Sequence, residues 1–242
     1  MGRSEHDPML ARIGRMTWTA TTLLIVQGFV CGVALLPAVM ILSFILRIAG
    51  SNRVVQVVLV SLALMPAYVL FALCLMMVSP LAVRLLGWRT PPDASMRIAD
   101  IDWPLLSWVR YLASLHLVRV VAGTLFRGTP MWTLHLRLAG ATLGRRVYVN
   151  SLAVSDYNLL ECGDDVVIGG SAHMAGHTVE RGVVKTARVR LGDRVTIGLG
   201  SVVEIGADIG PGAQIGAMSF VPKYAKLPGG VVYVGVPAVP IK

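Results

Sequence analysis

Residues 191–227 read LGDRVTIGLGSVVEIGADIGPGAQIGAMSFVPKYAKL, and an aliphatic residue returns at every sixth position of this stretch. The positions in step are Leu191, Ile197, Val203, Ile209, Ile215, Val221 and Leu227. Glycine follows at positions 192, 198, 210 and 216. A less regular series with the same character precedes it, at Leu143, Val149, Cys162, Ile168 and Met174.

A period of six is typical of a left-handed parallel β-helix, an all-β fold in which each hexapeptide repeat forms one face of a triangular coil of about 18 residues. The aliphatic side chain points into the narrow prism, and glycine suits a turn with unusual backbone angles. Stacked coils satisfy one another's backbone hydrogen bonds. The region shows no helical period of 3.6, which argues against a two-layer α/β domain. We therefore expect a β-helix domain over residues 134–242.

The apolar excess of the chain is concentrated in its first 86 residues. Overall the sequence is 55% hydrophobic and 14% charged, with a mean hydropathy of +0.69. Residues 17–46 and 54–83 contain no charged side chain. A membrane-spanning helix needs about 20 apolar residues, whereas the apolar part of a signal peptide has only about 7–15. The sequence thus predicts a hairpin of two transmembrane helices within residues 17–89, preceded by a basic segment over residues 1–16.

The formal net charge of +9 is better explained by topology than by nucleic acid, because the chain has no lysine or arginine run and no nucleic-acid-binding motif. Basic residues flank the hairpin on both outer sides, at Arg3, Arg12, Arg15, Arg84, Arg89 and Arg97, while its loop has Arg47 and Arg53. By the positive-inside bias we expect both termini and the β-helix domain to be cytoplasmic.

Residues 90–133 are expected to form a linker that contains an amphipathic helix. Thr90-Pro-Pro-Asp93 breaks the apolar pattern, and residues 103–126 are apolar with interruptions at Arg110, His116 and Arg119. Such a helix suits the membrane surface, where Trp103 and Trp108 would lie among the head groups. Packing against the soluble domain is an equally open alternative.

The six-residue register slips between Met174 and Leu191, which are 17 positions apart where 18 would be regular. Polar residues fill this gap, and a break in a solenoid is where loops that carry sites project. We identify His177 as the candidate general base, since a neutral imidazole accepts a proton near pH 7. Glu180 is expected to orient its ring or to bind an acceptor. The alternative is a solvated bulge that only adjusts the coil.

A zinc site is the weaker reading of the same region. His173 and His177 would need a third ligand such as His135, and Cys31, Cys74 and Cys162 have no metal-binding or disulfide spacing. We therefore predict no metal.

Four motifs resemble a known family. They are His135-Leu-Arg-Leu-Ala-Gly-Ala-Thr-Leu-Gly144, Ser155-Asp-Tyr-Asn-Leu-Leu-Glu-Cys-Gly-Asp164, His177-Thr-Val-Glu180 with Lys185, and Gly235-Val-Pro-Ala238. Together they are similar to the bacterial hexapeptide-repeat acyltransferases. They are more closely similar to the membrane-embedded C-terminal region of poly-lysine-synthetase-type nonribosomal peptide synthetases.

The resemblance implies a homotrimer in the bacterial inner membrane, with acetyl-CoA or another acyl-CoA in the groove between neighbouring β-helices. It implies CoA contacts from Lys223, Lys226, Gly235, Pro237 and Ala238. It also implies acceptor contacts from Asp156, Asn158 and Lys185. Asn158 stands where the family pattern has aspartate, which suggests a different acceptor.

The leading hypothesis is therefore a membrane-anchored acyltransferase. It would move an acetyl or other acyl group from CoA to a hydroxyl or amine on a small or lipid-linked acceptor, with backbone N–H groups of tight glycine turns stabilising the oxyanion. Two alternatives remain open. One is a non-catalytic trimeric scaffold of a membrane complex, and the other is a peptide-bond-forming partner of a nonribosomal peptide synthetase.

Overall fold

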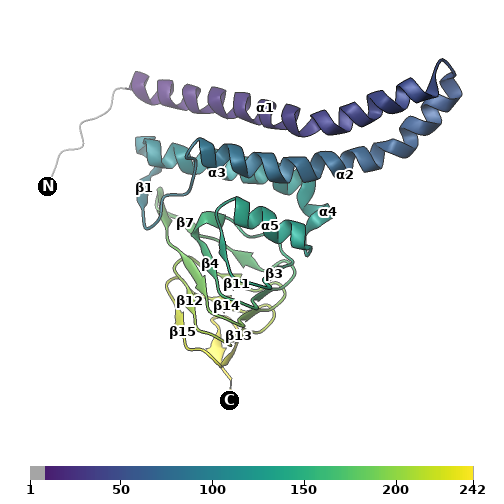
Figure 1. The fold of residues 1–242 in the computed structure, drawn as a ribbon. Coiled ribbons are helices and arrows are strands. Elements are labelled where there is room, and N and C mark those ends of the chain that lie inside the picture. Colours follow the sequence, from purple (N-terminus) through teal and green to yellow (C-terminus); the bar gives the residue numbers. More distant parts are fainter. Residues whose placement is uncertain (1–8, 242) are drawn as a thin grey trace.

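Two long antiparallel helices form the outer layer of the molecule (Figure 1). The computed structural model describes residues 9–241, so Arg3 lies outside the described part. Helix α1 (Met9–Ala49) and helix α2 (Arg53–Leu85) extend beyond the charge-free runs at both ends. Asn52 caps α2, because its Oδ1 accepts from the backbone N–H of Val54 at 3.1 Å and of Val55 at 3.3 Å. Both helices are long and apolar enough to cross a membrane.

The two halves of α2 have different surroundings. Tyr68 donates from its hydroxyl to the carbonyl of Val121, and Arg84 donates to the carbonyl of Arg137 at 3.2 Å, so the second half lies against the rest of the protein. Its side chains Ala72, Leu75, Met76, Ser79, Pro80 and Val83 are buried. In the first half, by contrast, most of the large apolar side chains are exposed.

A second helical layer lies between the hairpin and the strands (Figure 1). It consists of α3 (Trp103–Val118), the π-helical turn η2 (Arg119–Gly123), α4 (Thr124–Phe126) and α5 (Pro130–Leu138). The stretch Trp103–Phe126 is also long and apolar enough to span a membrane, but 44% of its most apolar window is buried inside the protein, against 17% for α1 and α2. This favours the second alternative for the amphipathic helix, packing against the rest of the chain.

The remaining chain forms short strands wound into coils. Four extended elements lie outside the parallel stack: β1 (Ser95–Arg97), β7 (His177–Glu180), β8 (Val183–Thr186) and the antiparallel β17 (Val239–Pro240). The stacked strands are β2 (Thr142–Leu143), β3 (Tyr148–Val149), β4 (Leu160–Cys162), β5 (Val167–Ile168), β6 (His173–Met174), β9 (Val189–Leu191), β10 (Thr196–Ile197), β11 (Val202–Val203), β12 (Asp208–Ile209), β13 (Gln214–Ile215), β14 (Phe220–Val221), β15 (Lys226–Leu227) and β16 (Val232–Val234). Short 3-10 turns occur at η1 (Ile98–Asp100) and η3 (Tyr157–Leu159).

These strands form the three faces of a prism, in the orders β15-β12-β9-β4-β2, β16-β13-β10-β5-β3 and β14-β11-β6. Ile197 pairs with Ile215 and Val203 with Val221, so partners beyond the break are 18 positions apart, as the period predicts. Across the break, Ile168 pairs with Ile197, 29 positions away. The segment from Met174 to Leu191 therefore covers one face rather than three. The predicted slip of one residue is wrong, since the break is an 11-residue insertion.

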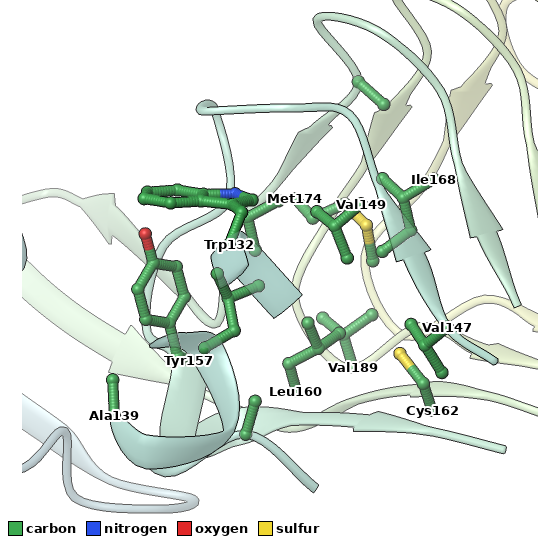
Figure 2. Close-up of a cluster of buried hydrophobic side chains, with 14 of the residues drawn as sticks. Trp132, Ala139, Val147, Val149, Tyr157, Leu160, Cys162, Ile168, Met174 and Val189 are labelled. Atoms are coloured by element: carbon green, nitrogen blue, oxygen red, sulfur yellow. The ribbon is translucent and has the colours of Figure 1, made fainter. Parts of the chain in front are cut away.

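The interior of the prism is lined by the residues that the period singled out. Val149, Ile168, Met174, Ile197, Val203, Ile209, Ile215 and Val221 are all buried. At the helical end, Trp132 of α5 and Tyr157 close the prism over Met174 and Leu160 (Figure 2). The indole N–H of Trp132 donates to the carbonyl of Ser151 at 3.2 Å, which satisfies its buried polar group.

The repeat glycines are needed for close stacking rather than for unusual backbone angles. Neither Gly198 nor Gly210 has a positive φ. A Cβ on Gly198 would lie 2.5 Å from the backbone nitrogen of Ala217, and one on Gly210 would lie 2.5 Å from that of Gly229. Our expectation of unusual φ and ψ at these positions is thus wrong. The backbone of the next coil occupies the space that a side chain would need.

We predict that Gly198→Ala destabilises the protein by about 1–3 kcal/mol, because the backbone of the next coil must shift. Gly32→Ala in α1 is the matched control, as its Cβ would meet nothing within 4 Å. Thermal unfolding in detergent measures both. Equal unfolding midpoints for the two variants would contradict the stacking argument.

His135 joins α5 to the hairpin. Its Nδ1 lies 3.0 Å from the carbonyl oxygen of Met76, and its ring packs between Trp132 and Tyr157, with centroids 5.2 and 6.0 Å away. Its side chain is 1% exposed, and this burial lowers its pKa to about 4. The folded protein therefore holds this ring in its neutral form.

Because the pKa of His135 is lower in the folded than in the unfolded chain, its contribution to stability is complete above pH 6.5. It is lost as the pH falls toward 4. The difference between the ordinary pKa of 6.5 and the folded-state pKa of about 4 corresponds to about 3 kcal/mol. We predict that wild type loses this much stability on acidification relative to His135→Gln, measured by unfolding in detergent between pH 7 and 4. Parallel pH profiles would contradict it.

Candidate functional site

The 11-residue insertion forms a β-hairpin, which we call the arm (residues 177–186). β7 and β8 pair antiparallel, with His177 opposite Thr186 at the base. The tip has positive φ at Arg181 and Gly182. β8 also pairs antiparallel with β1, which belongs to the segment that follows α2. The projecting loop that the sequence predicts is thus an ordered strand pair, held on its other edge by the linker.

Asp156 is the centre of the polar network at the base of the arm. It is fully buried, and each of its carboxylate oxygens accepts two hydrogen bonds. Oδ2 accepts from His177 Nδ1 at 2.5 Å and from Ser155 Oγ at 3.0 Å. Oδ1 accepts from Thr90 Oγ1 at 2.7 Å and from Trp108 Nε1 at 3.2 Å. All four groups around this carboxylate can donate a hydrogen, so its oxygens act as the acceptors.

This network determines which nitrogen of His177 is free. An ionised carboxylate only accepts hydrogen bonds, so Nδ1 of the ring carries the hydrogen that points to Asp156. Nε2 is then the basic nitrogen. The same division of roles is used wherever a buried aspartate holds a histidine as general base. The ring is partly exposed, and Trp108 packs against it edge-on, with centroids 5.1 Å apart and planes at 69°.

His177 lines a cavity of about 640 Å³ between the helical layer and the coils. The helical wall consists of Leu112, Ala113, His116 and Arg119. The opposite wall includes Ser155, His173, Ala175, Thr178, Val179 and Glu204. Both charge signs and apolar side chains line this space, so it can hold a polar substrate beside the imidazole.

The structure places a different carboxylate beside the histidine from the one we expected. Glu180 lies near the arm tip, where it accepts from Lys185 at 2.9 Å and from Lys223 of the last coils. These hydrogen bonds, chiefly that from Lys223, lower the pKa of Glu180 to about 2. Lys223 also donates to Thr178 Oγ1 at 2.9 Å. Glu180 therefore fastens the arm to the coils, and Asp156 orients His177.

The residues expected to bind the acceptor are separated. Asp156 is the buried hydrogen-bond partner of His177, whereas Lys185 pairs with Glu180 in the arm. Asn158 points to the linker: its Nδ2 donates to the carbonyl of Thr90 at 2.8 Å, and its Oδ1 accepts from the Thr90 N–H at 3.3 Å. It lines a separate cavity of about 460 Å³ with Arg84 and Arg89. The asparagine thus holds the linker in place.

The predicted CoA contacts lie at the far end of the prism. Lys226 is exposed on β15. Gly235, Pro237 and Ala238 form the turn between β16 and β17, where the N–H of Ala238 donates to the carbonyl of Phe220 at 2.7 Å. Lys223 already has a carboxylate partner in Glu180. Of the two lysines, Lys226 is therefore the one without an ion pair among residues 9–241.

The geometry does not assemble a metal site among residues 9–241, where no group of three histidine, cysteine or acidic side chains is arranged to hold a metal ion. His135, the third ligand that this chain could offer in the zinc alternative, is buried in α5, with its Nδ1 3.0 Å from the carbonyl oxygen of Met76.

Sequence reasoning missed Thr90 and Trp108. Trp108 was expected among lipid head groups, and Thr90 was noted only as a break in the apolar pattern. In the sequence Trp108 is 48 positions and Thr90 is 66 positions from Asp156, and no local sequence pattern indicates a contact over such a separation.

The chain is similar to several solved structures of acetyltransferases. The structure of a hexapeptide-repeat-containing acetyltransferase from Vibrio cholerae matches with a TM-score of 0.45 at 16% identity, over 55% of this chain and 89% of its own. Galactoside acetyltransferase in complex with coenzyme A matches with a TM-score of 0.40 and 24% identity, over 53% of this chain and 81% of its own. Maltose O-acetyltransferase from Clostridium difficile gives 0.37 and 21%, over 58% and 88%.

At the sequence level, the delta-poly-L-ornithine synthetase of Acinetobacter baumannii is 26% identical over 170 residues. The match covers 69% of this chain but only 12% of that protein. No protein-family model matches the chain. Hexapeptide-repeat acetyltransferases and a poly-amino-acid synthetase, the two kinds of protein that the sequence motifs were expected to resemble, are thus among the proteins to which this chain is similar.

Proposed function

We propose that this protein is a membrane-anchored acyltransferase that moves an acetyl or other acyl group from CoA to a hydroxyl or amine, with His177 as general base. The observation that carries the proposal is the pairing of His177 Nδ1 with the buried Asp156 at 2.5 Å, beside a cavity of about 640 Å³. A histidine held in one tautomer at the edge of a cavity is suited to take a proton from a bound substrate.

In this mechanism His177 Nε2 removes the proton from the acceptor's O–H or N–H group as that atom attacks the thioester carbonyl. The acyl group passes from sulfur to the acceptor, and CoA leaves as the thiol. The positive charge that develops on the ring is offset by Asp156, whose four hydrogen bonds hold it in place. Asp156 thus takes the supporting role that we expected of Glu180.

The acyl-CoA would be the co-substrate, and Lys226 with the turn of Gly235, Pro237 and Ala238 are the residues proposed to contact it. Lys226 is exposed and has a charge suited to a phosphate. The proposal keeps the homotrimer, in which a neighbouring copy would complete the CoA groove. The acceptor is a small or lipid-linked molecule.

The hairpin would anchor the protein in the membrane, with both termini and the β-helix domain on the cytoplasmic side, where CoA is available. Residues 53–67 of α2 precede Tyr68, whose hydroxyl bonds to Val121 of the helical layer, and at 1.5 Å per residue they are roughly 23 Å long. These residues would enter the hydrocarbon core, which is about 30 Å thick. The second half, which packs on α5, would stand at the membrane surface.

A second candidate function is peptide-bond formation, in which the acyl donor is carried by a separate peptide synthetase. The match to delta-poly-L-ornithine synthetase favours it. Dependence of product formation on an added adenylation and carrier protein distinguishes this candidate from free acyl-CoA transfer. A scaffold without catalysis is the remaining alternative.

The test is turnover of acetyl-CoA by the detergent-purified protein with a panel of small amines and alcohols. Turnover is monitored through the free CoA thiol that is released. We expect His177→Gln to lower turnover at least about a hundredfold. Asp156→Asn, which leaves the ring without its acceptor, should cause a loss of similar size. Asp208→Asn, an exposed carboxylate on β12, is the matched control and should retain activity. Equal turnover in His177→Gln would refute the assignment.

A further inference from the structure

The hydrogen bonds on Asp156 come from two different parts of the protein. Its Oδ2 accepts from Ser155, next to it in the chain, and from His177 in the arm. Its Oδ1 accepts from Thr90 and Trp108. Thr90 belongs to the linker after α2, and Trp108 belongs to α3. The linker and the helical layer therefore hold one carboxylate oxygen, and the coils with their arm hold the other.

Trp108 has a second contact with the same pair. Its indole lies edge-on to the His177 ring, with centroids 5.1 Å apart. It also packs against a small apolar cluster that joins three elements, formed by Met96 of β1, Leu105 of α3 and Val184 of β8. The cluster fixes the indole relative to the arm. Its N–H and its ring edge thus meet Asp156 and His177 at the same time.

We propose that Trp108 is a positioning residue for the Asp156–His177 pair, so that the helical layer is a part of the site and more than an anchor. This inference rests on the proposed function. Trp108 acts through Asp156: its N–H holds Oδ1 and thereby turns Oδ2 toward His177 Nδ1. It also compensates part of the negative charge of a carboxylate that is shielded from water.

A merely structural role for Trp108 would depend on the ring alone, whereas positioning depends on the N–H. Trp108→Phe removes the donor and retains an aromatic ring beside the histidine. Thr90→Val removes the other donor to Oδ1 without changing the ring. Trp103→Phe is the matched control, because Trp103 is on the same helix, is 51% exposed, and has no hydrogen bond to Asp156.

The readout is the pH dependence of His177 modification by diethyl pyrocarbonate, measured by mass spectrometry on the full-length protein in detergent. The reagent attacks the neutral ring. When Asp156 loses a donor, its charge is less compensated and stabilises the protonated ring. The titratable and charged groups beside this ring are Asp156, which bonds to it, and His116, Arg119, His173 and Glu204, which line the same cavity; all of them remain in every variant.

We expect the midpoint of the modification profile to move upward by roughly half to one pH unit in Trp108→Phe and in Thr90→Val. Trp103→Phe should match wild type. In the acetyl-CoA turnover assay, Trp108→Phe should lower kcat about tenfold at an unchanged KM. An unshifted midpoint in a folded Trp108→Phe protein would overturn the proposal. If that variant does not fold, 3-benzothienylalanine at position 108, which replaces the N–H by sulfur in a ring of the same shape, decides the question by the same criterion.

The modification readout requires no substrate, so the two proposals can fail separately. A shifted midpoint in a protein with no acyl transfer would refute only the proposed function. Loss of turnover in His177→Gln together with an unshifted midpoint in Trp108→Phe would refute only the positioning role.

Discussion

Backbone hydrogen bonding between successive coils is the constraint on which the other features depend. Beyond the break each strand pairs with the strand 18 positions later, and the coils approach so closely that no side chain fits at Gly198 or Gly210. A prism stacked in this way has no room for additional residues on its faces. The 11 extra residues between Met174 and Leu191 must therefore project outward, and they do so as the arm that carries His177 at its base.

The arm acquires its position from both ends of the molecule. At its tip, Glu180 is held by Lys223 of the last coils, and along its edge β8 pairs with β1 of the linker. At its base, His177 meets Asp156, which the helical layer also contacts. The site is thus formed where the coils, the arm and the helices meet. The coils contribute Asp156, the arm contributes His177 and the helices contribute Trp108.

The sequence predicts much of this because its strongest signals are periodic. The six-residue period predicted the prism and its interior residues, and the charge-free runs predicted the two long helices. The same local information singled out His177, since the register breaks there. It misplaced the supporting carboxylate. Glu180 is three positions from His177, but alternation and extension along a strand carry it away from the ring, whereas Asp156 reaches the ring from 21 positions earlier across the fold. The glycines show the same limit, because the neighbour that requires Gly198 is the next coil.

The central claim is that these elements form an acyl-CoA-dependent site, and binding tests it most directly. Calorimetric titration of acetyl-CoA into the detergent-purified, full-length protein requires no knowledge of the acceptor. The account predicts saturable binding with a dissociation constant in the micromolar range, on the order of −8 kcal/mol. No binding at millimolar acetyl-CoA, in a protein whose folded state is verified, would contradict it.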